Sequence, residues 1–197
     1  MNMKKVGLFF GTFNPIHTGH LIIANHFVEF SDLEEVWFVI TPQNPFKAKQ
    51  SLLDNHHRYQ MVYEAIQDYP KLKPSKIEFD LPRPNYTIDT LAHLMEKYPT
   101  GHEFSLIMGE DNLKGLHKWK NYASILELFS LKVYPRVSKG GVDPLFKDHP
   151  KIKRVDAPIV EISSTFIRKA HRAGKNIRPL LPHAVWKYMD EMNFYRG

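Results

Sequence analysis

The residues best placed to do chemistry lie in one short segment, residues 11–20, with the sequence GTFNPIHTGH. The segment follows an apolar run at residues 6–10 and leads into residues 20–30, whose apolar positions recur at helical spacing. It therefore predicts a strand, a loop and the start of a helix. Because a helix start offers unpaired N–H groups and a positive dipole end, we expect a phosphate there, at the carboxyl edge of a parallel sheet.

His17 and His20 are the titratable side chains of this loop. If the helix has begun by His17, the two imidazoles lie on neighbouring turns of one face and both can donate to phosphate oxygens. Each could instead cap or pack the helix, and the pair could be half of a metal site. We expect no metal site built by protein side chains, because the segment contains no cysteine or carboxylate as a further ligand.

The rest of the sequence predicts the strands and helices that position this loop. Apolar runs alternate with amphipathic stretches, which is typical of a βαβ series. We expect strands at 6–10, 36–40, near Ile77, 104–108 and 130–134, and helices at 20–30, 56–68, 87–97, 113–128 with a break near Asn121, 164–172 and 183–192. Residues 41–54, 81–85 and 135–150 read as loops, since they combine proline or glycine with charged residues.

This alternation predicts an α/β fold, a Rossmann-like doubly wound and mostly parallel sheet with a small helical C-terminal part. No linker or internal repeat divides the 197 residues, so we expect a single domain over residues 1–197. No run approaches the roughly 20 apolar residues that a membrane span needs, and no signal-like segment opens the chain. We therefore expect a cytoplasmic protein that binds no membrane.

The composition of the chain excludes several kinds of catalytic and metal site. The chain has no cysteine, which excludes disulfides, thiolate nucleophiles and iron–sulfur clusters. Its formal charge of +6 suits anionic partners of several kinds. Because the basic residues are spread along the chain, a solvated basic surface is a better interpretation than a nucleic-acid groove.

A second segment, residues 162–168 with the sequence ISSTFIR, places hydroxyl groups at a helix start and Arg168 one turn later. Taken alone, Ser163 would be a helix cap and Arg168 a surface residue. Together with residues 11–20, the segment resembles the two signatures, His-x-Gly-His and Ser-x-Thr-x-x-Arg, of a nucleotidyltransferase superfamily. Asn14 stands where that superfamily usually has aspartate.

The sequence between the two signatures resembles the nicotinate-nucleotide adenylyltransferase family. The matching features are residues 41–47 (TPQNPFK), 85–90 (NYTIDT), 109–112 (GEDN), Trp119 and Arg136. The resemblance implies adenylyl transfer from ATP to nicotinate mononucleotide in NAD biosynthesis, with Mg²⁺ carried by the substrate phosphates. The implied partners are these two nucleotides and no nucleic acid, and a homo-oligomer is left open.

The resemblance also implies roles for individual residues. The catalytic residues, which steady the triphosphate, are His17, His20, Lys47 and Arg168. The ATP-binding residues are Gly11, Thr12, Phe13, His17, His20, Gly109, Asp111, Arg136, Ser163, Thr165 and Arg168. The residues that bind nicotinate mononucleotide are Asn14, Lys47, Tyr86, Thr87 and Trp119. Among these, Trp119 is expected to stack on the pyridine ring and Thr87 to meet the nicotinate carboxylate. Lys120 departs from the family, which often has an aromatic residue there.

Three other functions remain open on the sequence. A relative that acts on another phosphorylated acceptor, such as phosphopantetheine, is disfavoured by the segments around Tyr86 and Trp119. A fragment of a class I tRNA synthetase is disfavoured by the length of the chain and the lack of an anticodon-binding part. A basic nucleic-acid-binding module would bind oligonucleotides in a salt-sensitive way and would not turn over ATP.

Overall fold

The computed structural model describes residues 3–43, 52–137 and 144–196. Six strands within these residues form one sheet in the order β3-β2-β1-β4-β5-β6, and all neighbouring strands are parallel. The strands are β1 (Lys4–Gly11), β2 (Glu35–Ile40), β3 (Leu72–Ser75), β4 (His102–Gly109), β5 (Ser130–Tyr134) and β6 (Ile152–Arg154). The strand order reverses between β1 and β4, which in doubly wound sheets is where ligands bind, outside the carboxyl ends of the strands.

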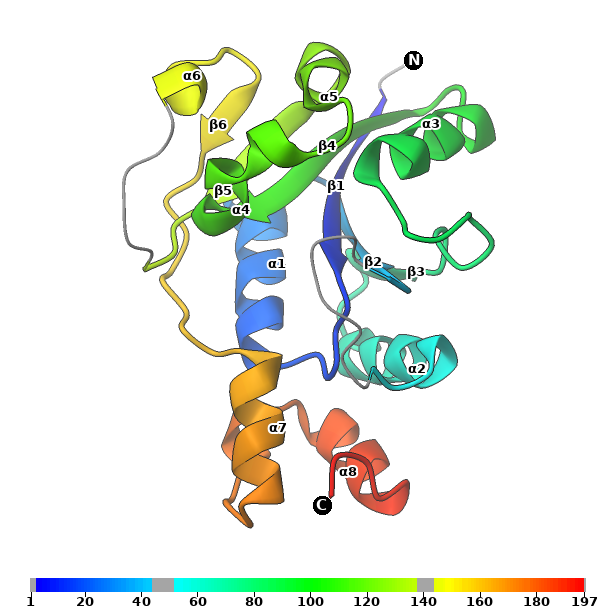
Figure 1. Cartoon of the computed structure of the whole chain (residues 1–197), viewed down its shortest axis with the longest axis vertical. Coiled ribbons are helices and arrows are strands. Elements are labelled where there is room, and N and C mark those ends of the chain that lie inside the picture. The colour runs from blue at the N-terminus through cyan, green and yellow to red at the C-terminus, as the bar shows by residue number, and fades with distance from the viewer. Residues whose placement is uncertain (1–2, 44–51, 138–143, 197) are drawn as a thin grey trace.

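Helices cover both faces of the sheet (Figure 1). They are α1 (Thr18–Phe30), α2 (Asn55–Ile66), α3 (Thr87–Lys97), α4 (Glu110–Lys114), α5 (Tyr122–Leu128), α6 (Pro144–Lys147), α7 (Ser164–Arg172) and α8 (His183–Glu191), with 3₁₀ turns η1 (Leu116–Lys118) and η2 (Arg178–Leu180). Within the described residues, none of these helices is both long and apolar enough to cross a bilayer. The expected Rossmann-like α/β fold is confirmed, and the helices α7 and α8 form its C-terminal part.

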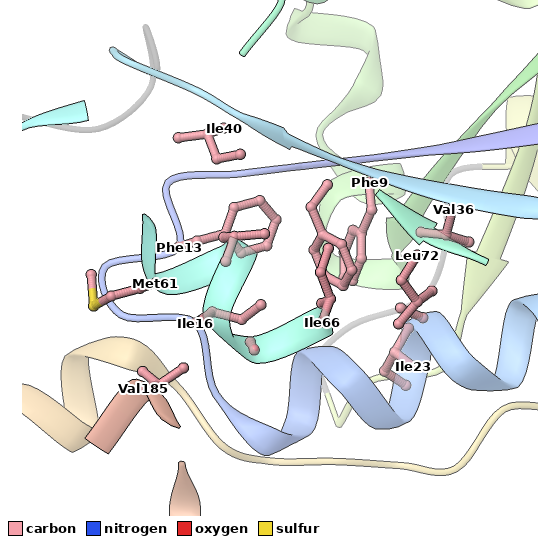
Figure 2. Close-up of a cluster of buried hydrophobic side chains, with 14 of the residues drawn as sticks. Phe9, Phe13, Ile16, Ile23, Val36, Ile40, Met61, Ile66, Leu72 and Val185 are labelled. Carbon is pink, nitrogen blue, oxygen red and sulfur yellow. The ribbon is translucent and has the colours of Figure 1, made fainter. Parts of the chain in front are cut away.

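Alternate residues of β1 point to opposite faces of the sheet and build two cores. Phe9 packs in the cluster that includes α1 and α2, while Leu8 belongs to the cluster that includes α3 and α5. Figure 2 shows that the first cluster continues past the strand, because Phe13 and Ile16 of the loop lie in it together with Val185 of α8. The loop after β1 is therefore anchored in the hydrophobic core, and the C-terminal helices pack against the same core.

Two expectations about the strands were wrong or incomplete. The strand expected near Ile77 lies earlier, at Leu72–Ser75, and Ile77 falls in the turn that follows. β3 and β6 are the edge strands, and both are short and largely polar, so they lack the apolar runs that identify buried strands. An edge strand also tolerates Pro74, because its missing N–H leaves no buried partner unpaired.

The stretch 113–128 also differs from the single broken helix that its pattern favours. It contains the end of α4, η1 and α5, and Asn121 at the break adopts a left-handed conformation with φ 50°. α6 lies inside the expected loop 135–150, and β6 follows that loop where no strand was expected. The expected bounds of α3, β5 and α7 agree with the structure, because each has a clear apolar period and a local start signal.

Candidate active site

A cleft of about 440 Å³ opens at the carboxyl ends of β1 and β4, where the strand order reverses. Most residues expected to bind ATP line it, namely Gly11, Thr12, Phe13, His17, His20, Asp111, Arg136, Ser163, Thr165 and Arg168. The other lining residues are Phe9, Phe10, Pro42, Gln43, Leu52, Arg83, Ile107, Met108, Asn112, Tyr134, Ile162 and Ser164. The two sequence signatures therefore face one another across a single cleft.

The loop after β1 is held in a strained conformation by a buried arginine. Phe13 has φ 44°, a value that a bulky side chain adopts only under constraint and at a cost of about 1–3 kcal/mol. Arg58 of α2 is fully buried beneath the loop, and its Nη1 donates to the carbonyl oxygens of Thr12 at 2.6 Å and Thr41 at 2.9 Å. Its Nε donates to the carbonyl oxygen of Leu53 at 3.0 Å. Arg58 thus ties three chain segments together at the floor of the site.

The two histidines stack on each other instead of occupying successive helical turns. α1 begins at Thr18, so His17 is the residue that precedes the helix, and the two ring centroids lie 3.7 Å apart. The backbone N–H of His17 donates to Nδ1 of His20 at 3.2 Å. Because Nδ1 accepts this bond, the proton of neutral His20 lies on Nε2. His20 is thereby oriented as a donor through Nε2, the form that a phosphate oxygen requires.

His17 is neutral at neutral pH. Burial lowers its pKa to about 4, and the positive charge of Arg136 acts in the same direction. Its Nδ1 is buried and has no hydrogen-bond partner among the residues that the structure describes. A neutral imidazole can donate one hydrogen bond or accept one, so His17 can serve a ligand without adding charge.

The second signature is fastened directly to the first. Ser163 caps α7 by accepting the N–H of Phe166 at 3.2 Å, as its helix-cap interpretation predicts. Ser164 Oγ donates to the carbonyl oxygen of Pro15 at 2.8 Å, and Arg168 Nη1 donates to the carbonyl oxygen of Asn14 at 2.8 Å. Arg168 thus lies in the cleft instead of on the outer surface, and the start of α7 is set against the loop after β1.

Asp111 and Arg136 line the cleft beside the end of β4, and Gly109, the last residue of β4, lies next to them but is not in the lining. A Cβ at Gly109 would lie 2.7 Å from Cδ of Arg136 and closer still to Oδ1 of Asp111, so these side chains would have to shift if the glycine were replaced. Arg136 Nε lies 3.9 Å from Oδ1 of Asp111. Asp111 is the single carboxylate among the described residues that line the cleft. The cleft therefore has one cationic and one anionic side chain side by side at this end of β4.

The residues expected to bind the pyridine nucleotide lie elsewhere. Tyr86 and Thr87 stand at the start of α3, and Trp119 is partly buried against the core below α3 and α5. Lys120 joins the two segments: its Nζ lies 3.0 Å and 2.9 Å from the carboxylate oxygens of Asp89 and 4.8 Å from the ring centroid of Tyr86. None of these residues is in the lining of the 440 Å³ cleft.

The remaining residues expected to bind the mononucleotide are Asn14 and Lys47. Asn14 does not line the cleft and is fully buried, where its Oδ1 accepts the N–H of Leu53 at 3.3 Å and the hydroxyl of Tyr195. Lys47 lies outside the described residues.

Sequence reasoning missed Arg83 and Tyr195. Arg83 lines the cleft from the loop that precedes Tyr86, and a basic residue between two prolines next to a recognised motif is the signal that could have identified it. Tyr195 has no such signal, because nothing near it in the sequence indicates contact with Asn14.

Comparison with known proteins shows the family and the fold of this chain. A family model described as cytidylyltransferase-like matches residues 8–170. A protein from Christiangramia forsetii named "Probable nicotinate-nucleotide adenylyltransferase" is 67% identical over 98% of this chain and 99% of its own length. A protein of the same name from Bacteroides fragilis is 46% identical over 95% of this chain and 92% of its own. The Plasmodium falciparum nicotinic acid mononucleotide adenylyltransferase, solved with NaAD, superposes with a TM-score of 0.82 at 20% identity, covering 98% of this chain and 97% of that one, and so shares the fold.

Proposed function

The chain belongs to the cytidylyltransferase-like family and, within it, to the nicotinate-nucleotide adenylyltransferases, and on that premise we propose how its residues carry out adenylyl transfer. The reaction joins ATP and nicotinate mononucleotide. An oxygen of the mononucleotide 5′-phosphate forms a bond to the α-phosphorus of ATP, and the bond from that phosphorus to the β-phosphate oxygen breaks. The products are nicotinate adenine dinucleotide and pyrophosphate, which carries away the electron pair of the broken bond.

The nucleophile needs no strong base. A phosphate monoester has a second pKa of about 6, so at neutral pH it is largely a dianion that is ready to attack. Catalysis then consists of holding two anions in line and stabilising the charge on the transferring phosphorus. This requirement fits a cleft whose lining includes Arg83, Arg136 and Arg168 and which contains a neutral His17.

We propose that His20 and Arg168 hold the triphosphate together with Lys47, and that His17 donates or accepts a further hydrogen bond there. The observation that carries this assignment is the attachment of α7 to the loop after β1, through the bonds of Ser164 to Pro15 and of Arg168 to Asn14. These bonds bring the donors of both signatures to one place, at the positive end of α1.

The other residues that we assign to ATP lie on two sides of the cleft. The backbone of residues 11–13 approaches the nucleotide from β1, and Ser163 and Thr165 offer hydroxyls from the start of α7. On the other side are Gly109, Asp111 and Arg136, which we assign to the ribose and adenine side. An ion-paired carboxylate suits ribose hydroxyl groups, because it accepts hydrogen bonds from them.

We place the acceptor's pyridine ring beside Trp119 and Tyr86, where an aromatic face suits a flat heterocycle. The nicotinate carboxylate then lies near Thr87, whose hydroxyl and neighbouring N–H groups begin α3. Asn14 is the expected contact on the mononucleotide side of the loop. Its Nδ2 is buried and without a hydrogen-bond partner among the described residues.

Mg²⁺ is the metal that we propose for this reaction, and it neutralises charge on the phosphates when bound. The residues present fit a metal carried by the substrate. Among the described residues there is no cluster of three or more histidine, aspartate or glutamate side chains that could hold an ion, and Asp111 is the single carboxylate lining the described part of the cleft. Mg²⁺ commonly keeps several waters and binds through one or two carboxylates plus substrate phosphates.

The proposal extends to the molecule as a whole. We propose that residues 1–197 act as one domain in the cytoplasm, with no nucleic-acid or membrane partner. The continuous sheet and its two cores support a single folding unit. A homo-oligomer is compatible with the proposal, and light scattering on the purified protein measures it directly.

The decisive test is pyrophosphate release from ATP and Mg²⁺ with nicotinate mononucleotide and nicotinamide mononucleotide offered separately. We expect clear preference for the nicotinate compound. Equal or reversed preference would contradict the assignment of Thr87 to the carboxylate. Release with neither compound would contradict adenylyl transfer itself, and oligonucleotide binding that weakens with salt would then support a nucleic-acid function.

A further inference from the structure

Tyr195 reaches the underside of the loop after β1 from the opposite end of the sequence. Its side chain is 8% exposed, and its hydroxyl donates to Oδ1 of Asn14. In Figure 1 the chain end marked C lies between α7 and α8, at the end of the molecule to which β1 runs. The segment after α8 therefore lies beneath the candidate active site.

The backbone around Tyr195 is strained. Asn193 has φ 54° and Tyr195 has φ 60°, both in the left-handed region that favours glycine. Contacts hold this turn in place: the N–H of Phe194 donates to the carbonyl oxygen of Met189 at 3.0 Å, and its ring centroid lies 4.8 Å from that of His57. These contacts fix the turn that carries the Tyr195 side chain.

Asn14 accepts hydrogen bonds from three segments of the chain. Its Oδ1 accepts from Tyr195 and from the N–H of Leu53 at 3.3 Å, and its carbonyl oxygen accepts from Nη1 of Arg168 at 2.8 Å. Two donors on Oδ1 fix which way the side-chain amide points, and Nδ2 is left over for another partner. Without the Tyr195 hydroxyl, only the N–H of Leu53 would hold the oxygen of this amide.

The surroundings keep the Tyr195 hydroxyl in its donating form. Burial raises the pKa of Tyr195 above its ordinary value, although the charges of Arg168 and Arg58 act in the opposite direction. The phenol consequently remains protonated throughout the neutral range and can donate to Asn14.

We propose that Tyr195 is a positioning residue for adenylyl transfer: its hydroxyl holds the Asn14 side chain and with it the backbone of residue 14, whose carbonyl oxygen accepts from Arg168 and so sets that guanidinium against the triphosphate. This inference rests on the function proposed for the cleft. It assigns to the segment after α8 a part in the reaction although the side chain itself lies outside the cleft lining.

The test uses Tyr195→Phe, which removes one oxygen and keeps the ring. The matched control is Tyr98→Phe, a partly buried tyrosine that packs against the core on the opposite face of the sheet. We expect kcat to fall about 10- to 100-fold in Tyr195→Phe, since a displacement near 1 Å can have this effect, and to stay near wild type in the control. The two variants should have similar melting temperatures.

Wild-type kcat in Tyr195→Phe, or an equal loss in both variants, would overturn the inference and leave the proposed function standing. Inactive wild-type protein would count against the proposed function instead.

A second measurement tests the route through Asn14. Both carboxylate oxygens of an aspartate accept hydrogen bonds, so in Asn14→Asp the orientation imposed by Tyr195 is redundant. The affinity for ATP, measured by calorimetry, should therefore fall more on adding Tyr195→Phe to the wild type than on adding it to Asn14→Asp. Equal changes in the two backgrounds would mean that the hydroxyl does not act through the Asn14 amide.

Discussion

Arg168 of α7 donates from Nη1 to the carbonyl oxygen of Asn14 at 2.8 Å, although the two residues are 154 positions apart in the sequence. This bond joins the two signature segments into one site. It also means that the guanidinium is held by the backbone of the loop after β1, so a change in that loop alters the position of a cation in the cleft.

Removal of the His20 imidazole should lower turnover far more than stability. His20→Asn retains an acceptor for the His17 N–H but loses the donor at Nε2, while His20→Ala loses both. We expect kcat to fall about 10²- to 10³-fold in each, the usual effect of losing one donor to a charged transition state. His26→Asn, on the same helix and partly exposed beside Phe30, is the control for helix stability. Near-normal turnover in His20→Asn would refute the role.

Arg83→Met should weaken the binding of anionic substrates. The Arg83 side chain is exposed and lines the cleft, so it attracts phosphate charge through a medium of high dielectric constant. A single interaction of this kind is worth about 1 kcal/mol, so we expect KM to rise roughly fivefold with little change in kcat. The difference from wild type should shrink as salt is added, because salt screens exposed charges. Lys97→Met, at the far end of α3, is a control that should leave KM unchanged.

Lys120 should influence the choice between the two pyridine mononucleotides. Asp89 lies in the first turn of α3, close to Thr87, and its charge is neutralised by Lys120. In Lys120→Met the uncompensated carboxylate repels nicotinate but not the uncharged nicotinamide. We expect KM for nicotinate mononucleotide to rise severalfold, by the electrostatics of two like charges near a surface, and KM for the nicotinamide compound to change less.

The control for this effect is the double variant Lys120→Met, Asp89→Asn, in which both charges are gone. It should recover most of the preference for nicotinate. The melting temperature should change little in either variant, because both side chains are about half exposed and such pairs contribute at most about 1 kcal/mol. An unchanged ratio of the two KM values in Lys120→Met would refute the effect.

Acid should destabilise the protein through His17. The pKa of this histidine is about 4 in the folded protein, against 6.5 for an unperturbed histidine, so below pH 6.5 the unfolded chain takes up a proton that the folded chain does not. The stability present above pH 6.5 is therefore lost progressively as the pH falls to about 4, by roughly 3 kcal/mol. Chemical denaturation across this range should give a flatter profile for His17→Asn. The exposed His117→Asn variant should follow the wild type, and an identical slope for His17→Asn would contradict the prediction.

Local features of the sequence determined much of this protein. The apolar periods of residues 6–10, 87–97 and 164–172 predict a strand and two helices, because side-chain spacing alone specifies which face of an element is buried. The loop at 11–20 and the hydroxyl-rich start of α7 identify the chemistry, since phosphate needs N–H, hydroxyl and cationic donors. Doubly wound topology then implies that both segments meet at the same edge of the sheet.

The tertiary structure decided what depends on distant parts of the chain. β3 could not be located from its sequence, because an edge strand with lysine and proline has no apolar period. The neutral state of His17 follows from burial, which the sequence does not encode locally. The contacts of Arg58 with the loop, of Lys120 with Asp89 and of Tyr195 with Asn14 join residues far apart in the sequence. Such pairs form only when the whole fold brings them together, so no local pattern could have identified them.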